Sequence, residues 1–290
     1  MKIYDCFTFF NETELLEIRL RLLDKYVDHF VIAESDLTHS GNPKPFNFEK
    51  EKPRFAPWME KIIYIPVHQC ADGLVFNPEQ TRYDPGSASW KLENEQRDAL
   101  SAIREQVLDE DLVIISDLDE LPHPGLLSKF SCPEKPLVFS LLFHYYFMNC
   151  QNKGKERWWN GCIISSGKYF KAHTPQEFRD NRHQYRLIKK AGWHFSYLGG
   201  VEMIKYKLRS FAHTEFNKEE YMDSDHIMKA ITGGKDILKR PDKRFRFVPI
   251  SYYPRFLQDI MQQYPSLIYL EDQKNPIRKL FYFFIDLFNR

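Results

Sequence analysis

The feature that most constrains this chain is a short apolar run, residues 112–115, that is followed at once by two aspartates, Asp117 and Asp119. An apolar run of this length bounded by charged residues is typical of a buried strand. In an extended backbone, residues i and i+2 point to the same side, so the two carboxylates would emerge together, roughly 6–7 Å apart. They would emerge at the carboxyl end of a strand, where open α/β sheets bind ligands.

The first 130 residues alternate between strand patterns and helix patterns. The segment from Asn11 is predicted to begin a helix, because Asn11 suits an N-cap and Glu14, three residues on, completes a pattern like a capping box. Residues 36–60 carry four prolines and polar residues and are predicted to form a long loop with room for one short turn. This alternation predicts an α/β fold with a mostly parallel central sheet flanked by helices. Strands are predicted over 2–10, 29–33, 61–67 and 112–115, and a long helix over 89–108.

The second half has strand patterns separated by polar loops, and neither a linker nor an internal repeat is visible. Strands are predicted over 137–149, 162–171 and 185–197, and helices over 200–212 and 218–231. We therefore expect one domain over 1–250, with a nucleotide-binding half at 1–130 and an acceptor half at 131–250. Residues 251–290 would form a C-terminal extension with an amphipathic, aromatic and basic helix over 277–290.

Composition excludes several classes of function. The formal net charge is +1, so no electrostatic bias toward nucleic acid follows, and no nucleic-acid partner is expected. Five cysteines without a CxxC pattern argue against a zinc site and against a disulfide framework. No signal-peptide pattern and no membrane-spanning run is present. We expect a cytoplasmic protein, with peripheral membrane contact through residues 277–290 as an option.

The aspartate pair by itself is compatible with more than one chemistry. Two adjacent carboxylates can hold a hard divalent cation against a phosphate-bearing substrate. A strand-terminal DxD also opens phosphatases of the haloacid dehalogenase class, in which Asp117 would be the nucleophile. Three strands precede the pair here, whereas that motif usually closes the first strand of its domain. A glycan-binding protein without catalysis is a third alternative.

A set of motifs in a fixed order makes the functional prediction more specific. The chain resembles glycosyltransferase family 17 over roughly residues 3–235. The resemblance rests on Tyr4-Asp5-Cys6-Phe7, Phe9-Phe10-Asn11-Glu12, Ile18-Arg19-Leu20, Phe30-Val-Ile-Ala-Glu34-Ser35, residues 90–97, Ser116-Asp-Leu-Asp-Glu120-Leu-Pro122 and Ala191-Gly-Trp-His194-Phe-Ser196. It implies a GT-A-type nucleotide-diphospho-sugar transferase fold and the transfer of N-acetylglucosamine or another hexose from a UDP-sugar to a glycan or glycoconjugate, with inversion.

The resemblance also implies a metal ion, Mn²⁺ or Mg²⁺, that offsets the negative charge of the leaving diphosphate. Asp119 is expected to be the direct ligand, and Asp117 to reach the ribose or a metal-bound water. His194 is expected to be the third ligand, with His213 as its rival. One of the basic residues Lys205, Lys207 and Arg209 could pair with the diphosphate.

The resemblance and the predicted topology together suggest residues for the two substrates. Besides Asp117, the nucleotide-sugar is expected to contact Phe7, Asn11, Glu34, Gln96 and Arg97. Trp158 and Trp159, in a predicted loop, are expected to stack on the acceptor sugar, because tryptophan faces pack well on sugar rings. Inversion needs a general base on the acceptor hydroxyl, and the candidates by position are Glu120, Glu177 and Asp180.

Overall fold

The protein is built on one eleven-stranded sheet, seen here in a computed structural model that describes residues 1–77 and 82–269. The main path of the sheet runs β11-β7-β6-β8-β4-β1-β2-β3, and β10, β5 and β9 lie off it. The strands are β1 Ile3–Phe9, β2 His29–Ser35, β3 Ile62–Val67, β4 Leu112–Asp117, β5 Glu120–Pro122, β6 Leu137–Tyr145, β7 Cys150–Asn152, β8 Trp158–Ser166, β9 Arg186–Ile188, β10 Gly192–Ser196 and β11 Phe245–Phe247.

The first half forms the parallel sheet that the alternating pattern predicts. Strand β1 lies between β2 and β4, β3 is added outside β2, and all three pairings are parallel. Strands β1, β2 and β4 are buried along almost their whole length. Burial on both faces explains why they read as continuous apolar runs rather than alternating ones.

The second half adds strands in both directions. Strand β8 pairs antiparallel with β4 on one side and with β6 on the other, so it joins the two halves into one sheet. Strands β9 and β10 are parallel to β6, whereas β5 and β7 run the opposite way. By these pairings most strands run in one direction, and the result is a mixed α/β fold with a mostly parallel sheet.

Helices cover both faces and the end of this sheet. The main helical segments are α1 Thr13–Leu23, α2 Asn47–Glu51, η1 Lys52–Trp58, α3 Ala88–Asp98, η2 Ala99–Gln106, α5 Gly167–Ala172, α6 Pro175–Asn181, α7 Gly200–Ser210, α8 Glu219–Met222, α9 Ser224–Thr232 and α10 Arg255–Met261. Short turns of helix lie at α4 Pro124–Leu127, η3 Arg182–Gln184, η4 Thr214–Phe216, η5 Ile250–Tyr252 and η6 Pro265–Leu267.

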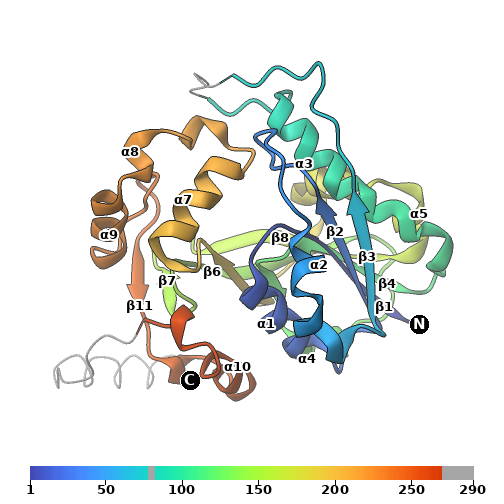
Figure 1. Cartoon of the computed structure of the whole chain (residues 1–290). Helices are drawn as coiled ribbons and strands as arrows, with labels where there is room; N and C mark the ends of the chain where they lie inside the picture. Colours follow the sequence, from blue (N-terminus) through green and yellow to red (C-terminus); the bar gives the residue numbers. More distant parts are fainter. Residues whose placement is uncertain (78–81, 270–290) are drawn as a thin grey trace.

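The longer helices pack on the sheet through buried apolar side chains. Figure 1 shows α7, α8 and α9 gathered beside β6, β7 and β11, with α3 over the ends of β2 and β3. One buried hydrophobic cluster lies between the sheet and helices α1 and α10, a second between the sheet and η2, α5 and α6, and a third between the sheet and α7 and α9.

Several local predictions were wrong. Helix α1 begins at Thr13 with Glu12 at the N-cap and no side-chain cap, so Asn11 does not cap it. The predicted loop 36–60 contains α2 and η1, which form because Phe48, Phe55 and Trp58 reach the core. The tryptophan pair begins strand β8 instead of lying in a loop.

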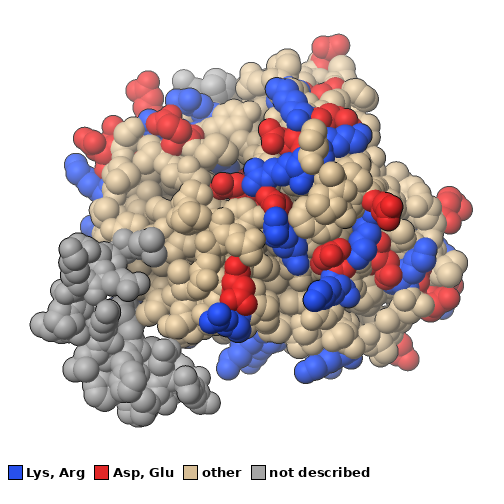
Figure 2. Space-filling model, turned by 60° about the horizontal axis from the view of Figure 1, so that its bottom comes forward, with Lys and Arg blue, Asp and Glu red and all other residues tan. Residues whose placement is uncertain are grey.

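On the face drawn in Figure 2, basic and acidic side chains are interspersed, as the near-neutral charge leads one to expect. Among the described residues, every helix is too short or too polar to cross a bilayer. The helix expected over 277–290, and the membrane contact assigned to it, lie outside the described residues.

Candidate functional site

The aspartate pair sits on a tight turn between β4 and β5. Asp117 is the last residue of β4, and Asp119 precedes β5, which begins at Glu120. The Asp117 side chain is 29% exposed and that of Asp119 is 11% exposed, so both carboxylates are partly shielded from solvent. The two carboxylates have different partners, and those partners give them different chemistry.

The buried guanidinium of Arg19, in α1, holds this turn in shape. Its Nη1 donates to the backbone carbonyls of the turn at 3.0, 3.1 and 3.0 Å, those of Asp117, Leu118 and Glu120. Its Nε and Nη2 donate to the two carboxylate oxygens of Asp5 in β1, at 2.8 and 2.6 Å. Because a guanidinium presents its donors in a rigid fork, Arg19 ties the turn to both β1 and α1.

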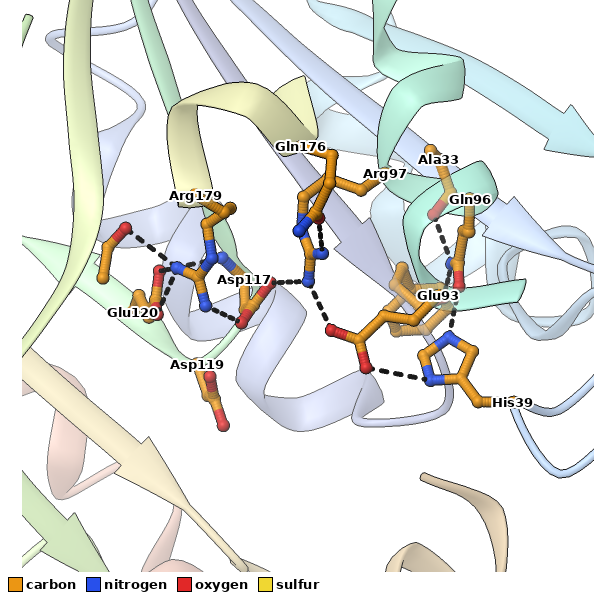
Figure 3. Close-up of polar contacts among 12 residues, drawn as sticks. Ala33, His39, Glu93, Gln96, Arg97, Asp117, Asp119, Glu120, Gln176 and Arg179 are labelled. Atoms are coloured by element: carbon orange, nitrogen blue, oxygen red, sulfur yellow. Dashed lines mark hydrogen bonds and ion pairs between the residues drawn. The ribbon is translucent and has the colours of Figure 1, made fainter. Parts of the chain in front are cut away.

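Asp117 is held by two arginines (Figure 3). Arg97 of α3 donates to its Oδ1 at 3.1 Å, and Arg179 of α6 donates to its Oδ2 at 2.7 Å. Burial by itself would raise the pKa of Asp117, but the two guanidinium groups outweigh it and lower the pKa to about 2. Asp117 is therefore ionised at neutral pH, with both oxygens engaged.

Asp119 faces an imidazole and an ammonium group. Its Oδ1 lies 3.3 Å from Nε2 of His194 in β10, and its Oδ2 lies 3.3 Å from Nζ of Lys207 in α7. Burial opposes ionisation, but Lys207 and His194 hold the pKa of Asp119 well below its usual range. The His194 ring packs against Phe143 and Trp159, with ring centroids 5.1 and 4.8 Å away, and those two rings also contact each other, with centroids 5.9 Å apart. The orientation of His194 toward Asp119 is thus fixed by packing.

The donors around Asp119 are suited to a divalent cation whose remaining ligands come from a substrate. The described residues include no group of three acidic, histidine or cysteine side chains arranged as a complete metal site. Asp119 and His194 offer carboxylate oxygens and one imidazole nitrogen, while Asp117 is engaged by arginines. Mg²⁺ is commonly held by one or two carboxylates together with substrate phosphates and water. Asp119 would supply carboxylate oxygens to such an ion and His194 a nitrogen, and the Lys207 ammonium group, 3.3 Å from Asp119, would have to move aside.

His213, the alternative third ligand, has other neighbours. Its Nδ1 lies 2.8 Å from Glu215, and its ring packs against Trp90 and Tyr83 near the start of α3. Asp119 is in contact with His194, and no contact joins it to His213 in the described part of the chain.

Among the three candidate bases, Glu120 is fully buried and its carboxylate is engaged. It accepts from Trp159 Nε1 at 2.6 Å, from Arg179 Nη1 at 2.8 Å and from the Asp117 backbone N–H at 3.0 Å. An acceptor hydroxyl cannot reach a carboxylate with no exposed surface. Glu120 instead anchors Arg179 and the turn. This corrects the expectation that Glu120 could act as a general base on the acceptor hydroxyl.

The other two candidate bases lie on α6. Glu177 closes a capping box with Thr174, so its carboxylate accepts the Thr174 N–H at 2.7 Å. Asp180 is exposed and accepts a hydrogen bond from Gln176 at 2.8 Å. Asp180 lies one residue from Arg179, and of the three it is the one whose carboxylate is accessible without breaking a cap.

Two of the residues expected at the nucleotide-sugar are placed in the core. Phe7 is fully buried, and the Arg19 guanidinium lies 4.4 Å from its ring centroid. Glu34 is also fully buried, and it accepts from Lys44 at 2.9 Å and from the Phe48 N–H at 3.0 Å. Neither side chain is exposed to a ligand here, because Phe7 packs under the turn and Glu34 holds the start of α2.

The remaining donor-side candidates lie along the strand ends. Asn11 is half-buried beside Lys207 at a small depression in front of α7. Gln96 donates to the Phe9 and Ala33 carbonyls at 3.1 and 2.9 Å, and so ties together the ends of β1 and β2. Arg97 reaches Asp117 directly, as described above. Gln96 and Arg97 thus shape the edge where a ligand would bind, and Arg97 contacts the acidic pair.

The two tryptophans expected at the acceptor face opposite sides of the sheet, because adjacent residues of a strand alternate. Trp159 stacks on His194 and belongs to the site around Asp119. Trp158 lies on the other face, where the Arg157 guanidinium is 5.7 Å from its ring centroid. The pair therefore does not form a single sugar-stacking surface.

Sequence reasoning missed Arg19 and Arg179, which position the acidic pair. Arg19 could have been noticed as a charged residue among the apolar positions of α1, between Ile18 and Leu20. Arg179 carries no such signal, because it lies in a short polar helix whose neighbours in space come from β4 and β5. Its role becomes visible only after the chain has folded.

Comparisons with known proteins assign this chain to a family. The family model described as glycosyltransferase family 17 matches residues 1–255. The chain is similar to β-1,4-mannosyl-glycoprotein 4-β-N-acetylglucosaminyltransferases from Rattus norvegicus and Homo sapiens, each 26% identical over 77% of this chain and 46% of the relative. The chain thus spans about half the length of the curated relatives it matches.

Among solved structures, the inositol-1-phosphate CTP transferase from T. maritima matches with a TM-score of 0.33 and 13% identity, over 65% of this chain and 85% of that chain. A similarity this low does not assign a fold. The family match covers the turn at Asp117–Asp119, the arginines that hold it and the histidine that faces it. The chain therefore belongs to glycosyltransferase family 17.

Proposed function

We propose that this protein is a metal-dependent enzyme with a GT-A-type fold that transfers N-acetylglucosamine or another hexose from a UDP-sugar to a glycan or glycoconjugate. The observation that carries the proposal is Asp119, which faces His194 and Lys207 at the carboxyl end of a parallel strand. Family membership supports the class of reaction. The names of the relatives make UDP-N-acetylglucosamine the first donor to test.

The cations around the pair suit a diphosphate leaving group. When bound, Mn²⁺ or Mg²⁺ would offset the negative charge that develops on the departing diphosphate. Lys207 would share that task, because its side chain is 26% exposed and its ammonium group lies only 3.3 Å from Asp119. On binding of the donor, a lysine can turn its flexible side chain from a carboxylate to a phosphate oxygen.

Asp117 has a positioning role in this proposal. Its two arginine partners keep it ionised and fixed, so it would accept a hydrogen bond from the ribose or from a metal-bound water.

The acceptor side requires a general base for inversion. Asp180 is our first candidate, because its carboxylate is exposed beside Arg179, and Glu177 is the second. Trp159 could offer its outer edge to the acceptor sugar while its ring holds His194. A cytoplasmic location with peripheral membrane contact through residues 277–290 remains part of the proposal.

A thermal-shift experiment tests the nucleotide and the metal together. A ligand that binds the native state raises apparent stability in proportion to ln(1 + [L]/Kd). We expect UDP with Mn²⁺ to raise the melting temperature, and UDP alone to do so far less. Asp119→Asn should remove the metal-dependent part, while Asp225→Asn, an exposed aspartate on α9, should keep it.

The alternatives give different results in the same experiment. A phosphatase would release phosphate from an aryl phosphate and lose that activity in Asp117→Asn. A non-catalytic glycan-binding protein would show shifts with sugars and none with nucleotides. The absence of any shift with UDP, UDP-N-acetylglucosamine and Mn²⁺ would contradict the proposed function.

A further inference from the structure

A group of basic side chains lies at the β6–β7–β11 end of the sheet, on the face away from Asp119. Gln151 of β7 is paired in register with His144 of β6 and with Arg246 of β11. Side chains of residues paired in register point to the same face of a sheet, and so do residues two apart along a strand. Gln151, Arg246 and Lys153 therefore share one face, the face that also carries Trp158.

Lys153 and Arg157 converge on the same tyrosine. Lys153 Nζ lies 5.1 Å from the Tyr252 ring centroid, and Arg157 Nη2 donates to the Tyr252 hydroxyl at 3.5 Å. Lys153 Nζ also donates to Gln151 Oε1. Three cations, Lys153, Arg157 and Arg246, are thereby gathered around Gln151 and Tyr252.

Two buried donors in this group have no partner. Gln151 is fully buried, and its Nε2 lacks a hydrogen-bond acceptor among the described residues. The Nε of Arg157 is buried and lacks one as well. A buried donor without an acceptor costs about 1–3 kcal/mol, and more when it is charged. Both donors are enclosed, so a ligand that brings acceptor oxygens would reach them only after the half-buried side chains of Lys153 and Arg157 shift.

Within the described part of the chain, no carboxylate balances the charge of this group. Burial, followed by the guanidinium groups of Arg157 and Arg246, lowers the pKa of Lys153 to about 8, and no described carboxylate acts in the opposite direction. The nearest acidic residues of the same loops have partners of their own: Glu156 pairs with Lys243, and Asp242 with Lys155. Like charges gathered in a partly buried site favour the binding of an anion.

We propose that Lys153, Arg157 and Arg246 form a binding site for the phosphate group of a second ligand. Arginine forks and lysine ammonium groups bind phosphate through charge-assisted hydrogen bonds, and the Gln151 amide would add a neutral donor. Trp158, beside Arg157, would contact the organic part of the ligand. This site is separate from the Asp119 site and does not depend on the function proposed for it.

Calorimetric titration with inorganic phosphate tests the site. Arg246→Gln is the first variant, because Arg246 is exposed and its replacement should leave the fold intact. Loss of one charge-assisted contact should weaken phosphate binding by about tenfold. Lys155→Gln is the matched control: it removes the same charge from a side chain that is 89% exposed and only two residues from Lys153, and it should leave the affinity unchanged. Lys207→Gln, at the other site, should also leave it unchanged.

Vesicle cosedimentation identifies the source of the phosphate. Binding to phosphatidylcholine vesicles that contain phosphatidic acid, lost in Arg246→Gln and kept in Lys155→Gln, would assign the site to a lipid headgroup. Phosphate binding with the same dependence on Arg246 but without vesicle binding would assign it to a soluble phosphate ester. The proposal is overturned if the wild-type protein binds neither probe, or if Arg246→Gln and Lys155→Gln weaken binding equally.

Discussion

At the scale of single residues, the two aspartates of the DxD motif are not equivalent. Asp117 lies between two arginines: Arg97 contacts one of its carboxylate oxygens and Arg179 contacts the other (Figure 3). Asp119 faces a histidine and a lysine, of which the lysine side chain can move. The first carboxylate is therefore suited to positioning, and the second to binding a cation.

Replacing Arg19 should destabilise the protein strongly. Arg19→Met removes the partner of the buried Asp5 and frees three carbonyls of the turn. Breaking a buried ion pair on one side typically costs about 3–5 kcal/mol. Urea denaturation should show this loss, whereas Arg21→Met should cost under about 1 kcal/mol, because Arg21 is a surface residue paired with Glu17. Equal losses in the two variants would show that Arg19 does not hold the turn.

The low pKa of Asp117 predicts a defined pH dependence. Its pKa is about 2 in the folded state against 3.8 in an ordinary aspartate, so between these values the unfolded chain binds more protons. Stability therefore rises with pH through this window, and the contribution, about 2 kcal/mol, is complete above about pH 4 and lost toward pH 2.

The stability gap between wild type and Asp117→Asn should accordingly shrink as the pH falls from 4 to 2. Urea denaturation at several pH values measures this gap. Asp225→Asn, at an exposed position, should show no comparable change. A gap that stays constant down to pH 2 would mean that the two arginines do not lower the pKa of Asp117.

At the scale of elements, close approach of strands builds the site. Strand β8 brings Gly161 directly against the Glu120 carboxylate, and the Gly161 carbonyl accepts from Arg179 at 2.8 Å. A methyl group on Gly161 would lie 1.8 Å from Glu120 Oε1, which is far inside van der Waals contact. Strand β8, the turn and α6 thus meet at a point where only glycine fits.

Gly161→Ala should therefore displace Glu120 and loosen Arg179. Overpacking of a buried site typically costs about 1–3 kcal/mol, and we also expect weaker binding of UDP with Mn²⁺. Denaturation and the thermal-shift assay measure the two effects. Gly86→Ala is the control, because its new methyl group would meet only the flexible side chain of Asp84 at 3.3 Å. Wild-type behaviour of Gly161→Ala would contradict the close contact.

At the scale of the whole molecule, the two halves share one sheet. Strand β8 pairs with both β4 and β6, and helix α10 near the C-terminal side packs against α1 near the N-terminus. The nucleotide and acceptor halves expected from the sequence therefore share a backbone hydrogen-bond network. The candidate site draws on both, because Asp119 follows β4 and His194 comes from β10.

We predict that the two halves unfold together. Amide hydrogen exchange should give the same limiting free energy of opening for β1 in the first half and β6 in the second. The reason is that β8 is hydrogen-bonded to both β4 and β6, so unfolding of either half breaks the hydrogen bonds that β8 makes to it. Mass spectrometry on peptides from these strands measures it. If the limiting free energy of opening is lower for β6 than for β1, the two halves unfold independently.

Much of this protein was determined by local sequence. The strands β1 to β4, the helix α7 and the position of Asp117 and Asp119 at a strand end follow from hydrophobic periodicity, which depends on neighbours within a few residues. The pairing of His194 with the acidic turn was also expected, although only the resemblance to a family indicated it.

Only the tertiary structure decided which side chains face a ligand. Glu34 and Glu120 look like functional carboxylates in the sequence, but contacts far along the chain bury them. Arg179 and Lys207 reach the aspartates from 62 and 88 residues away, and no local pattern encodes such distances. The position of Trp158 and Trp159 on a strand placed them on opposite faces. Local periodicity fixes where strands begin and end, whereas the charge around each aspartate is set by packing between segments distant in the sequence.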